Sequence, residues 1–312
     1  MKKTSTLIVV KEKLFFLWRV IERMRGQLTT LHRRPMYAKD YALVRDAPAD
    51  HARLAVVLQG PIVRDADFTL ETIKFYRIIF PNTPVIVSTW DDEDAEYLDR
   101  LRKEGAEVLV NKKPAYRGPS NINFQITSAS AGIQRAKDIG VDYVIKNRTD
   151  QRVYSPNSRE FLLNLVKAFP LTHNYPLQKQ RLANLCFATF KYKLYHASDT
   201  FIFGAIEDLL LYFDVALVSD QPRDKIFIPE HYLFSEFLKR IGRTLKGTLE
   251  DSWATYAEHL VIADQASLDL YWHKPKRHRE YPEREYHRNE NRLVYFSEWL
   301  NLYMDKNNCK EL

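Results

Sequence analysis

The feature that most constrains the fold of this chain is an apolar segment that runs directly into a dense polar cluster. Residues 141–145 have the composition of a buried strand, and residues 146–152 read KNRTDQR. In open α/β sheets, ligands bind beyond the carboxyl ends of the strands, so this boundary predicts the rim of a pocket. Strand side chains repeat every second residue, which places Arg148 and Asp150 on one face. A solvated strand end is the structural alternative.

Apolar segments with strand and helix periodicity alternate along the first half of the chain. They predict strands at 54–58, 85–90, 106–110 and 141–145, with helices at 67–80, 93–104 and 119–139 between them. This order predicts an α/β fold with a mainly parallel central sheet, right-handed crossovers and flanking helices. Further on, the pattern predicts helices at 157–169, 206–213, 229–241 and 294–302, and a strand at 200–203 that ends where Gly204 turns the chain.

Composition and motifs exclude several classes of protein. Hydrophobic residues make up 45% of the 312 residues and charged residues 28%, as in a soluble globular protein. No apolar run approaches the roughly 18 residues that span a bilayer. Cys186 and Cys309 are far apart, which argues against a disulfide framework or a zinc site and favours a reducing compartment. The absence of GxGxxG, P-loop, HExxH and GxSxG patterns argues against dinucleotide redox chemistry, P-loop phosphoryl transfer and zinc or serine hydrolysis.

Three segments are expected, with boundaries at 1–52, 53–250 and 251–312. The first contains a basic amphipathic helix at 11–27, with Trp18 among its apolar positions, followed by a linker. This helix could lie on an anionic membrane surface or pack against the domain or a partner, and both interpretations stay open. The second segment is the main α/β domain. The third is a helical, basic extension, either a surface arm for an anionic partner or a solvated face.

Two polar groups are predicted to accompany the strand end at Arg148. The first strand ends in Gln59, Gly60 and Pro61, a loop in which glycine lets a ligand approach the backbone. The helix after residue 119 presents the amides of Asn121, Asn123 and Gln125 in its first turn, where they could hydrogen-bond a ribose, a sugar or a diphosphate. Ser120 or Asn121 is expected to cap this helix.

Charged residues complete the predicted site. A departing diphosphate needs positive charge, either from a divalent cation held by Asp150, with manganese or magnesium expected, or directly from Lys146, Arg148 or Arg152. A base near an acceptor hydroxyl is also needed, and Glu230 is preferred with Asp199 second. Glu230 has a structural explanation as well, because a carboxylate is favoured in the first turn of a helix.

Five segments in order, LAVVLQGPI, SNINFQITSASAGI, VIKNRTDQRVY, SDTFIFG and IPEHYLFSEFL, resemble the bacterial WavE lipopolysaccharide-synthesis family over about residues 54–245. The resemblance implies a GT-A-like nucleotide-diphospho-sugar transferase fold. It also implies that Arg148 and Asp150 are the counterpart of the Asp-x-Asp element of GT-A enzymes. Because arginine replaces the first acid, metal binding by Asp150 and direct phosphate neutralisation by Arg148 both stay open.

These observations predict a glycosyltransferase that moves a sugar from a nucleotide-sugar donor to a glycan or glycolipid acceptor in lipopolysaccharide, O-antigen or capsule synthesis. The expected location is cytoplasmic, with peripheral attachment to the inner face of the cytoplasmic membrane left open. Two alternatives remain: a sugar nucleotidyltransferase of the same fold, and a protein whose basic ends bind an anionic polymer or nucleic acid. No nucleic acid partner is expected for the preferred function.

Overall fold

The structure is a computed structural model that describes residues 16–18, 20–21, 23–24, 34–41, 52–172, 175–219, 227–273 and 291–308. The chain forms two compact units, Met1–Met36 and Tyr37–Leu312. In the first unit the described residues between 16 and 24 are helical, as predicted for this part of the 11–27 segment. No helix in the described part of the chain is long and apolar enough to cross a membrane.

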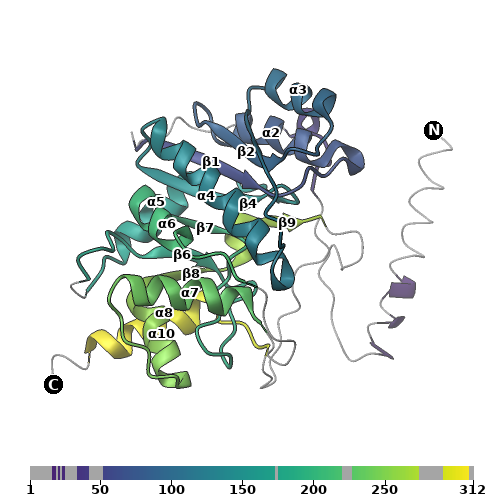
Figure 1. The fold of residues 1–312 in the computed structure, drawn as a ribbon. Helices are drawn as coiled ribbons and strands as arrows, with labels where there is room; N and C mark the ends of the chain where they lie inside the picture. The colour runs from purple at the N-terminus through teal and green to yellow at the C-terminus, as the bar shows by residue number, and fades with distance from the viewer. Residues whose placement is uncertain are drawn as a thin grey trace. The chain divides into compact units, whose positions relative to one another are not determined.

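The described part of the second unit is built on a seven-stranded sheet in the order β3-β2-β1-β4-β7-β6-β8 (Figure 1). Its strands are β1 (Leu54–Gln59), β2 (Val85–Trp90), β3 (Glu107–Asn111), β4 (Tyr143–Arg148), β6 (Leu182–Leu185), β7 (Ile202–Ala205) and β8 (Leu260–Ala263). All neighbours pair in parallel except β7, which is antiparallel to both β4 and β6. The predicted α/β fold with a mainly parallel sheet is therefore confirmed.

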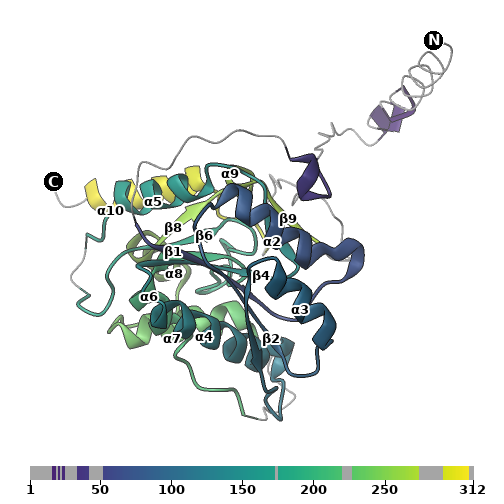
Figure 2. The ribbon, with the colours of Figure 1, turned by 90° about the horizontal axis from the view of Figure 1, so that it is seen from above.

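Helices cover both faces of the sheet. They are α2 (Phe68–Ile79), α3 (Ala95–Lys103), α4 (Ile122–Asp138), α5 (Ser158–Ala168), α6 (Ile206–Phe213), α7 (Pro229–Arg240), α8 (Leu249–His259), α9 (Gln265–Leu268) and α10 (Phe296–Asn308). Figure 2 shows α2, α5 and α10 over one face, and α4, α6 and α7 over the other. Asp94 caps α3 by accepting hydrogen bonds from two backbone N–H groups, so the helix predicted at 93–104 is confirmed, with its first residue at Ala95.

A short two-stranded sheet brings the segment near residue 273 to the end of β4. Strand β5 (Gln151–Val153) follows β4 almost directly and pairs antiparallel with β9 (Leu270–Trp272). Just beyond β9, the backbone N–H of His273 donates to the Asp150 carbonyl at 2.8 Å. Residues more than a hundred positions apart thus meet at the end of β4.

Strands β5, β6, β8 and β9 were not predicted, and β7 has a different end. The stretch before β6 has an irregular polar composition, and β8 follows α8 without any glycine or proline to mark the change. Strand β7 continues through Gly204 instead of ending there, so the predicted turn is wrong. A Cβ on Gly204 would lie 2.5 Å from a Leu182 methyl carbon, because β6 packs closely against this position.

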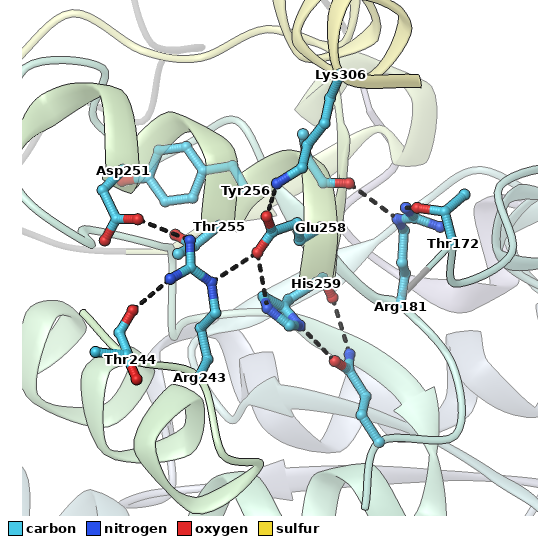
Figure 3. Close-up of polar contacts among 12 residues, drawn as sticks. Thr172, Arg181, Arg243, Thr244, Asp251, Thr255, Tyr256, Glu258, His259 and Lys306 are labelled. Atoms are coloured by element: carbon cyan, nitrogen blue, oxygen red, sulfur yellow. Dashed lines mark hydrogen bonds and ion pairs between the residues drawn. The ribbon is translucent and has the colours of Figure 1, made fainter. Parts of the chain in front are cut away.

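Ion pairs fasten the last helix to the rest of the unit (Figure 3). Arg243, just after α7, donates to Asp251 at 2.7 Å and to Glu258 at 2.8 Å, both on α8. Lys306 on α10 also contacts Glu258. These two carboxylates are almost wholly buried, so each depends on its cationic partner.

We predict that Glu258→Ala lowers the free energy of unfolding by about 3 kcal/mol, because it leaves the buried Arg243 guanidinium without one of its two carboxylates. Urea denaturation followed by circular dichroism measures the loss. The matched control is Glu236→Ala, which breaks the exposed pair with Lys239 and is expected to cost less than about 1 kcal/mol. Equal losses in the two variants would contradict a stabilising role for the Figure 3 network.

Candidate functional site

Three neighbouring strands bring the predicted charged residues to one edge of the sheet. In the parallel pair β1 and β4, Gln59 lies opposite Arg148, so the two carboxyl ends coincide. Strand β7 runs the other way, and its first residue, Ile202, lies opposite Lys146. The segment that leads into β7, including Asp199, therefore reaches the edge at which β4 ends.

Arg148 and Asp150 form a bidentate ion pair at this edge. Nε of Arg148 donates to one Asp150 carboxylate oxygen at 2.7 Å, and Nη2 donates to the other at 2.9 Å. The guanidinium also lies over the ring of Trp272, 5.5 Å from its centroid. Burial opposes the charge on Arg148, but the hydrogen bonds and charge of Asp150 outweigh it, so the pKa of Arg148 is raised. Arg148 is therefore a permanently charged group with a fixed orientation.

The described residues do not fit a divalent cation at Asp150. Both carboxylate oxygens of Asp150 accept hydrogen bonds from Arg148. The part of the chain that the structure describes contains no group of three or more His, Cys, Asp or Glu side chains that could hold a metal ion. A divalent cation normally takes several oxygen ligands, so one partly occupied carboxylate is too few. The metal role of Asp150 stays a prediction, and no step below depends on it.

Asp199 is held from two elements. Its carboxylate accepts a hydrogen bond from Nε2 of Gln125, in the first turn of α4, at 2.8 Å. Its backbone carbonyl accepts a hydrogen bond from the ammonium group of Lys146, on β4, at 2.5 Å. Asp199 is buried and Lys146 is fully buried. Gln125 thus reaches the site as predicted, although it contacts a carboxylate of the protein.

Glu230 lies in the first turn of α7, close to Asp199. Burial and the negative charge of Asp199 together raise the pKa of Glu230 to about 7. A carboxylate with a pKa near neutrality can accept a proton from a reacting hydroxyl at physiological pH. The side chain of Glu230 is 22% exposed, so it also remains within reach of a ligand.

His196 is a site residue that the sequence did not reveal. Its Nδ1 donates to the Ala188 carbonyl at 3.0 Å, because a carbonyl oxygen can only accept. Its Nε2 therefore carries a lone pair in the neutral ring, and it lies 3.9 Å from a carboxylate oxygen of Glu230. Burial lowers the pKa of His196 to about 4, so the ring is neutral. The only sequence signal was its position three residues before Asp199.

The loop after β1 is fixed by two residues from other elements. Gly60 has a φ of +119°, a backbone conformation that residues with a side chain rarely adopt. The hydroxyl of Thr149 donates to the Pro61 carbonyl at 2.6 Å, and the Ile62 N–H donates to the Glu93 carboxylate at 2.8 Å. Glu93 thus holds this loop in place, a contact that the sequence did not predict.

Three predicted donor-binding side chains turn inward and do not fit direct contact with a donor. Lys146 is enclosed, as described above. Gln59 is buried and its side-chain oxygen accepts a hydrogen bond from Ser128 at 2.8 Å. Asn123 is buried, and its amide bonds to the backbone N–H and carbonyl of Val218. These groups position the helix and loop around the site. Gly60 is buried as well, whereas Pro61, Asn121, Gln125, Arg148 and Asp150 retain exposed surface.

The expected cap of α4 is also corrected. Asn121 immediately precedes the helix but makes no side-chain cap hydrogen bond. Both Ser120 and Asn121 have positive φ values, of 52° and 63°, whereas a capping side chain requires an extended backbone. Asn121 is exposed, so its amide remains available at the site edge.

The chain matches one family model. The model is described as WavE lipopolysaccharide synthesis, and it covers residues 54–245. The resemblance predicted from the five sequence segments, and its span, are confirmed. Among curated proteins, none matches the chain.

Solved structures with similar folds include three that act on nucleotides or sugars by their names. A cytidylyltransferase from Leptospira borgpetersenii is 12% identical, with a TM-score of 0.36 over 83% of this chain and 96% of its own. A nucleotide-diphospho-sugar transferase, so named provisionally, from Desulfovibrio desulfuricans is 10% identical, with a TM-score of 0.36 over 61% and 77%. Glucosyl-3-phosphoglycerate synthase from Mycobacterium tuberculosis, solved with Mn²⁺, UDP and phosphoglyceric acid, is 14% identical, with a TM-score of 0.34 over 70% and 87%. Scores this low add nothing on substrate or mechanism.

Proposed function

The chain belongs to the WavE lipopolysaccharide synthesis family, and we propose that it transfers a sugar from a nucleotide-activated donor to a growing bacterial surface glycan. The observation that carries the proposal is that two groups of different chemistry, Arg148 and Glu230, both lie near Asp199. Arg148 supplies a fixed positive charge, and Glu230 is a partly exposed carboxylate that changes charge near neutral pH. An inverting transfer from a sugar nucleotide needs both kinds of group.

Arg148 is assigned to the diphosphate. Its bonds to Asp150 use Nε and Nη2, so the N–H groups of Nη1 can donate to a phosphate oxygen. Asp150 then acts as the group that orients the guanidinium. Pro61 and Asn121 lie at the same edge and retain exposed surface, so we assign them to the rest of the donor.

Glu230 is assigned to the acceptor. In an inverting transfer, the acceptor oxygen forms a bond to the anomeric carbon while the bond from that carbon to the diphosphate oxygen breaks. The electron pair of the broken bond leaves with the nucleoside diphosphate, whose charge Arg148 stabilises. The hydroxyl proton moves to Glu230. Asp199 favours this movement, because its negative charge strengthens the attraction of Glu230 for a proton.

The N-terminal unit is assigned to an anionic membrane surface. Residues 1–36 hold nine Lys and Arg and two Glu, so their net charge of +7 equals that of the whole chain. Large apolar side chains in the helical part are exposed, among them Phe16 at 72% and Met24 at 82%. Basic residues together with exposed apolar side chains favour the interface of a bilayer that contains anionic lipid. An acceptor built on a lipid would be presented at such a surface.

We predict that one class of sugar nucleotide raises the melting temperature of the protein, and that the rise persists in EDTA because Arg148 supplies the charge. Thermal-shift measurements against a panel of sugar nucleotides, with manganese or with EDTA, identify the donor. With that donor, kcat is expected to rise as the pH increases toward 7, because Glu230, with a pKa of about 7, must lose its proton before it can act as a base.

The matched variant is Glu230→Gln, which keeps the shape of the side chain. It should retain the thermal shift and lose at least about 100-fold in kcat. Stabilisation by no sugar nucleotide would overturn the proposed function. Release of pyrophosphate from a nucleoside triphosphate and a sugar phosphate would instead identify a nucleotidyltransferase.

We predict that the full chain sediments with vesicles that contain phosphatidylglycerol, and much less with pure phosphatidylcholine. Binding should weaken in high salt, because attraction between exposed charges is screened. Trp18→Ser combined with Phe16→Ser should reduce sedimentation at least tenfold. Val110→Ser, which removes an exposed apolar side chain from β3, is the control. Equal binding by the two variants would contradict the membrane assignment.

A further inference from the structure

Lys146 occupies an unusual position for a lysine. It lies on the central strand β4, is fully buried, and its ammonium group lies 5.4 Å from the ring centroid of Phe213. This group donates a hydrogen bond to the Asp199 carbonyl. Burying an ammonium group costs free energy unless hydrogen bonds and an opposite charge compensate it. An apolar side chain at this position would avoid that cost, so we expect the buried charge of Lys146 to have a function.

We propose that Lys146 is a positioning residue for the acceptor-activating carboxylates: it holds the Asp199 backbone in place and supplies the buried positive charge that balances the Asp199 carboxylate beside Glu230. Through Asp199, Lys146 then sets the protonation of Glu230 without touching either substrate. This inference rests on the proposed function, because it assigns Glu230 as the base for the acceptor.

The contacts of Asp199 support a positioning role. Lys146 fixes its backbone carbonyl from β4, and Gln125 fixes its carboxylate from α4. The adjacent Ser198 is tied as well, because its N–H donates to the Thr189 hydroxyl at 3.0 Å. Because different elements hold the backbone and the side chain of Asp199, its distance from Glu230 is fixed. Its electrostatic effect on Glu230 is then fixed as well.

The charges around Lys146 leave Asp199 as its effective partner. Arg148 and Asp150 also act on Lys146, with opposite signs, but these two residues are paired with each other. Burial lowers the pKa of Lys146 to about 7, while the charge of Asp199 opposes the shift. The negative charge of Asp199 therefore favours the protonated form of Lys146, which titrates near neutral pH.

Several ionisable groups surround Glu230, and their charges determine its pKa. The charge of Asp199 raises the pKa of Glu230, and the charge of Lys193 acts weakly in the opposite direction. His196 is neutral, and the Tyr212 hydroxyl on α6 is neutral too, because burial raises its pKa well above the usual range. Glu230 and Lys146 are therefore the two groups in this cluster that titrate near neutral pH, and Asp199 interacts with both of them.

The test is the pH profile of transfer by Lys146→Met, a substitution of similar length without charge. In the unsubstituted protein, kcat should pass through a maximum near pH 7, because Glu230 must lose its proton and Lys146 must keep its own, and both pKa values are about 7. In Lys146→Met the alkaline fall should disappear, and kcat at pH 7 should drop at least tenfold, with the KM for the donor changed less than threefold. Lys137→Met, on the exposed far end of α4, should keep the unsubstituted profile.

A lysine that merely fills space would lower kcat or stability without altering the alkaline limb. An alkaline limb that survives in Lys146→Met therefore overturns the proposal.

A second measurement needs no substrate. The pKa of Lys146 can be followed by NMR in protein with ¹³C-labelled lysine, with Lys146→Met to assign the signal. Asp199→Asn should lower the pKa of Lys146 by at least one unit, because the opposing charge is lost, whereas Asp142→Asn at the other end of β4 should leave it unchanged. An unchanged Lys146 pKa in Asp199→Asn overturns the proposal even where transfer is observed. A lowered pKa in a protein that binds no sugar nucleotide overturns the proposed function alone.

Discussion

The pairing of β4 with β1 on one side and with β7 on the other is the constraint on which the site depends. The β1 register places the Gly60 loop beside Arg148, and the antiparallel β7 register brings the segment with Asp199 to the same edge. A slip of one residue would exchange the faces of β4 and carry Lys146 and Arg148 away from their partners. The buried contact between Lys146 and the Asp199 carbonyl lies at this junction.

Charge at the edge is arranged in pairs. Arg148 with Asp150 and Lys146 with Asp199 are held close together in partly or fully buried surroundings, where the attraction between opposite charges is stronger than in water. Glu230 stands beside these pairs, with a neutral His196 and a carboxylate as its nearest ionisable neighbours. In the proposed function, this arrangement would separate two tasks: a permanent positive charge would face the leaving group, and a carboxylate with variable charge would face the acceptor.

The sequence predicted most of the parallel half of the sheet, because each strand and helix there has a clear period and a clear end. It did not predict β5, β6, β8 and β9, whose pairing depends on distant residues. In the site, Arg148 does lie beside Asp150. The two-residue period of a strand does not explain the contact, because β4 ends at Arg148 and Asp150 lies in the turn that follows. The same reasoning could not tell that Lys146, Gln59 and Asn123 turn inward, since burial depends on what packs over a residue. His196 and Glu93 were missed because their partners lie in other elements.

Binding of the nucleoside diphosphate product tests the central claim most directly, because it isolates the role of Arg148 from the chemistry of transfer. Isothermal titration calorimetry in EDTA would compare the unsubstituted protein with Arg148→Met. An arginine that donates charge-assisted hydrogen bonds to a phosphate contributes about 1.5–3 kcal/mol to binding. The account therefore predicts that Kd rises at least tenfold in Arg148→Met. An unchanged Kd, or binding of the unsubstituted protein only in the presence of manganese, would contradict it.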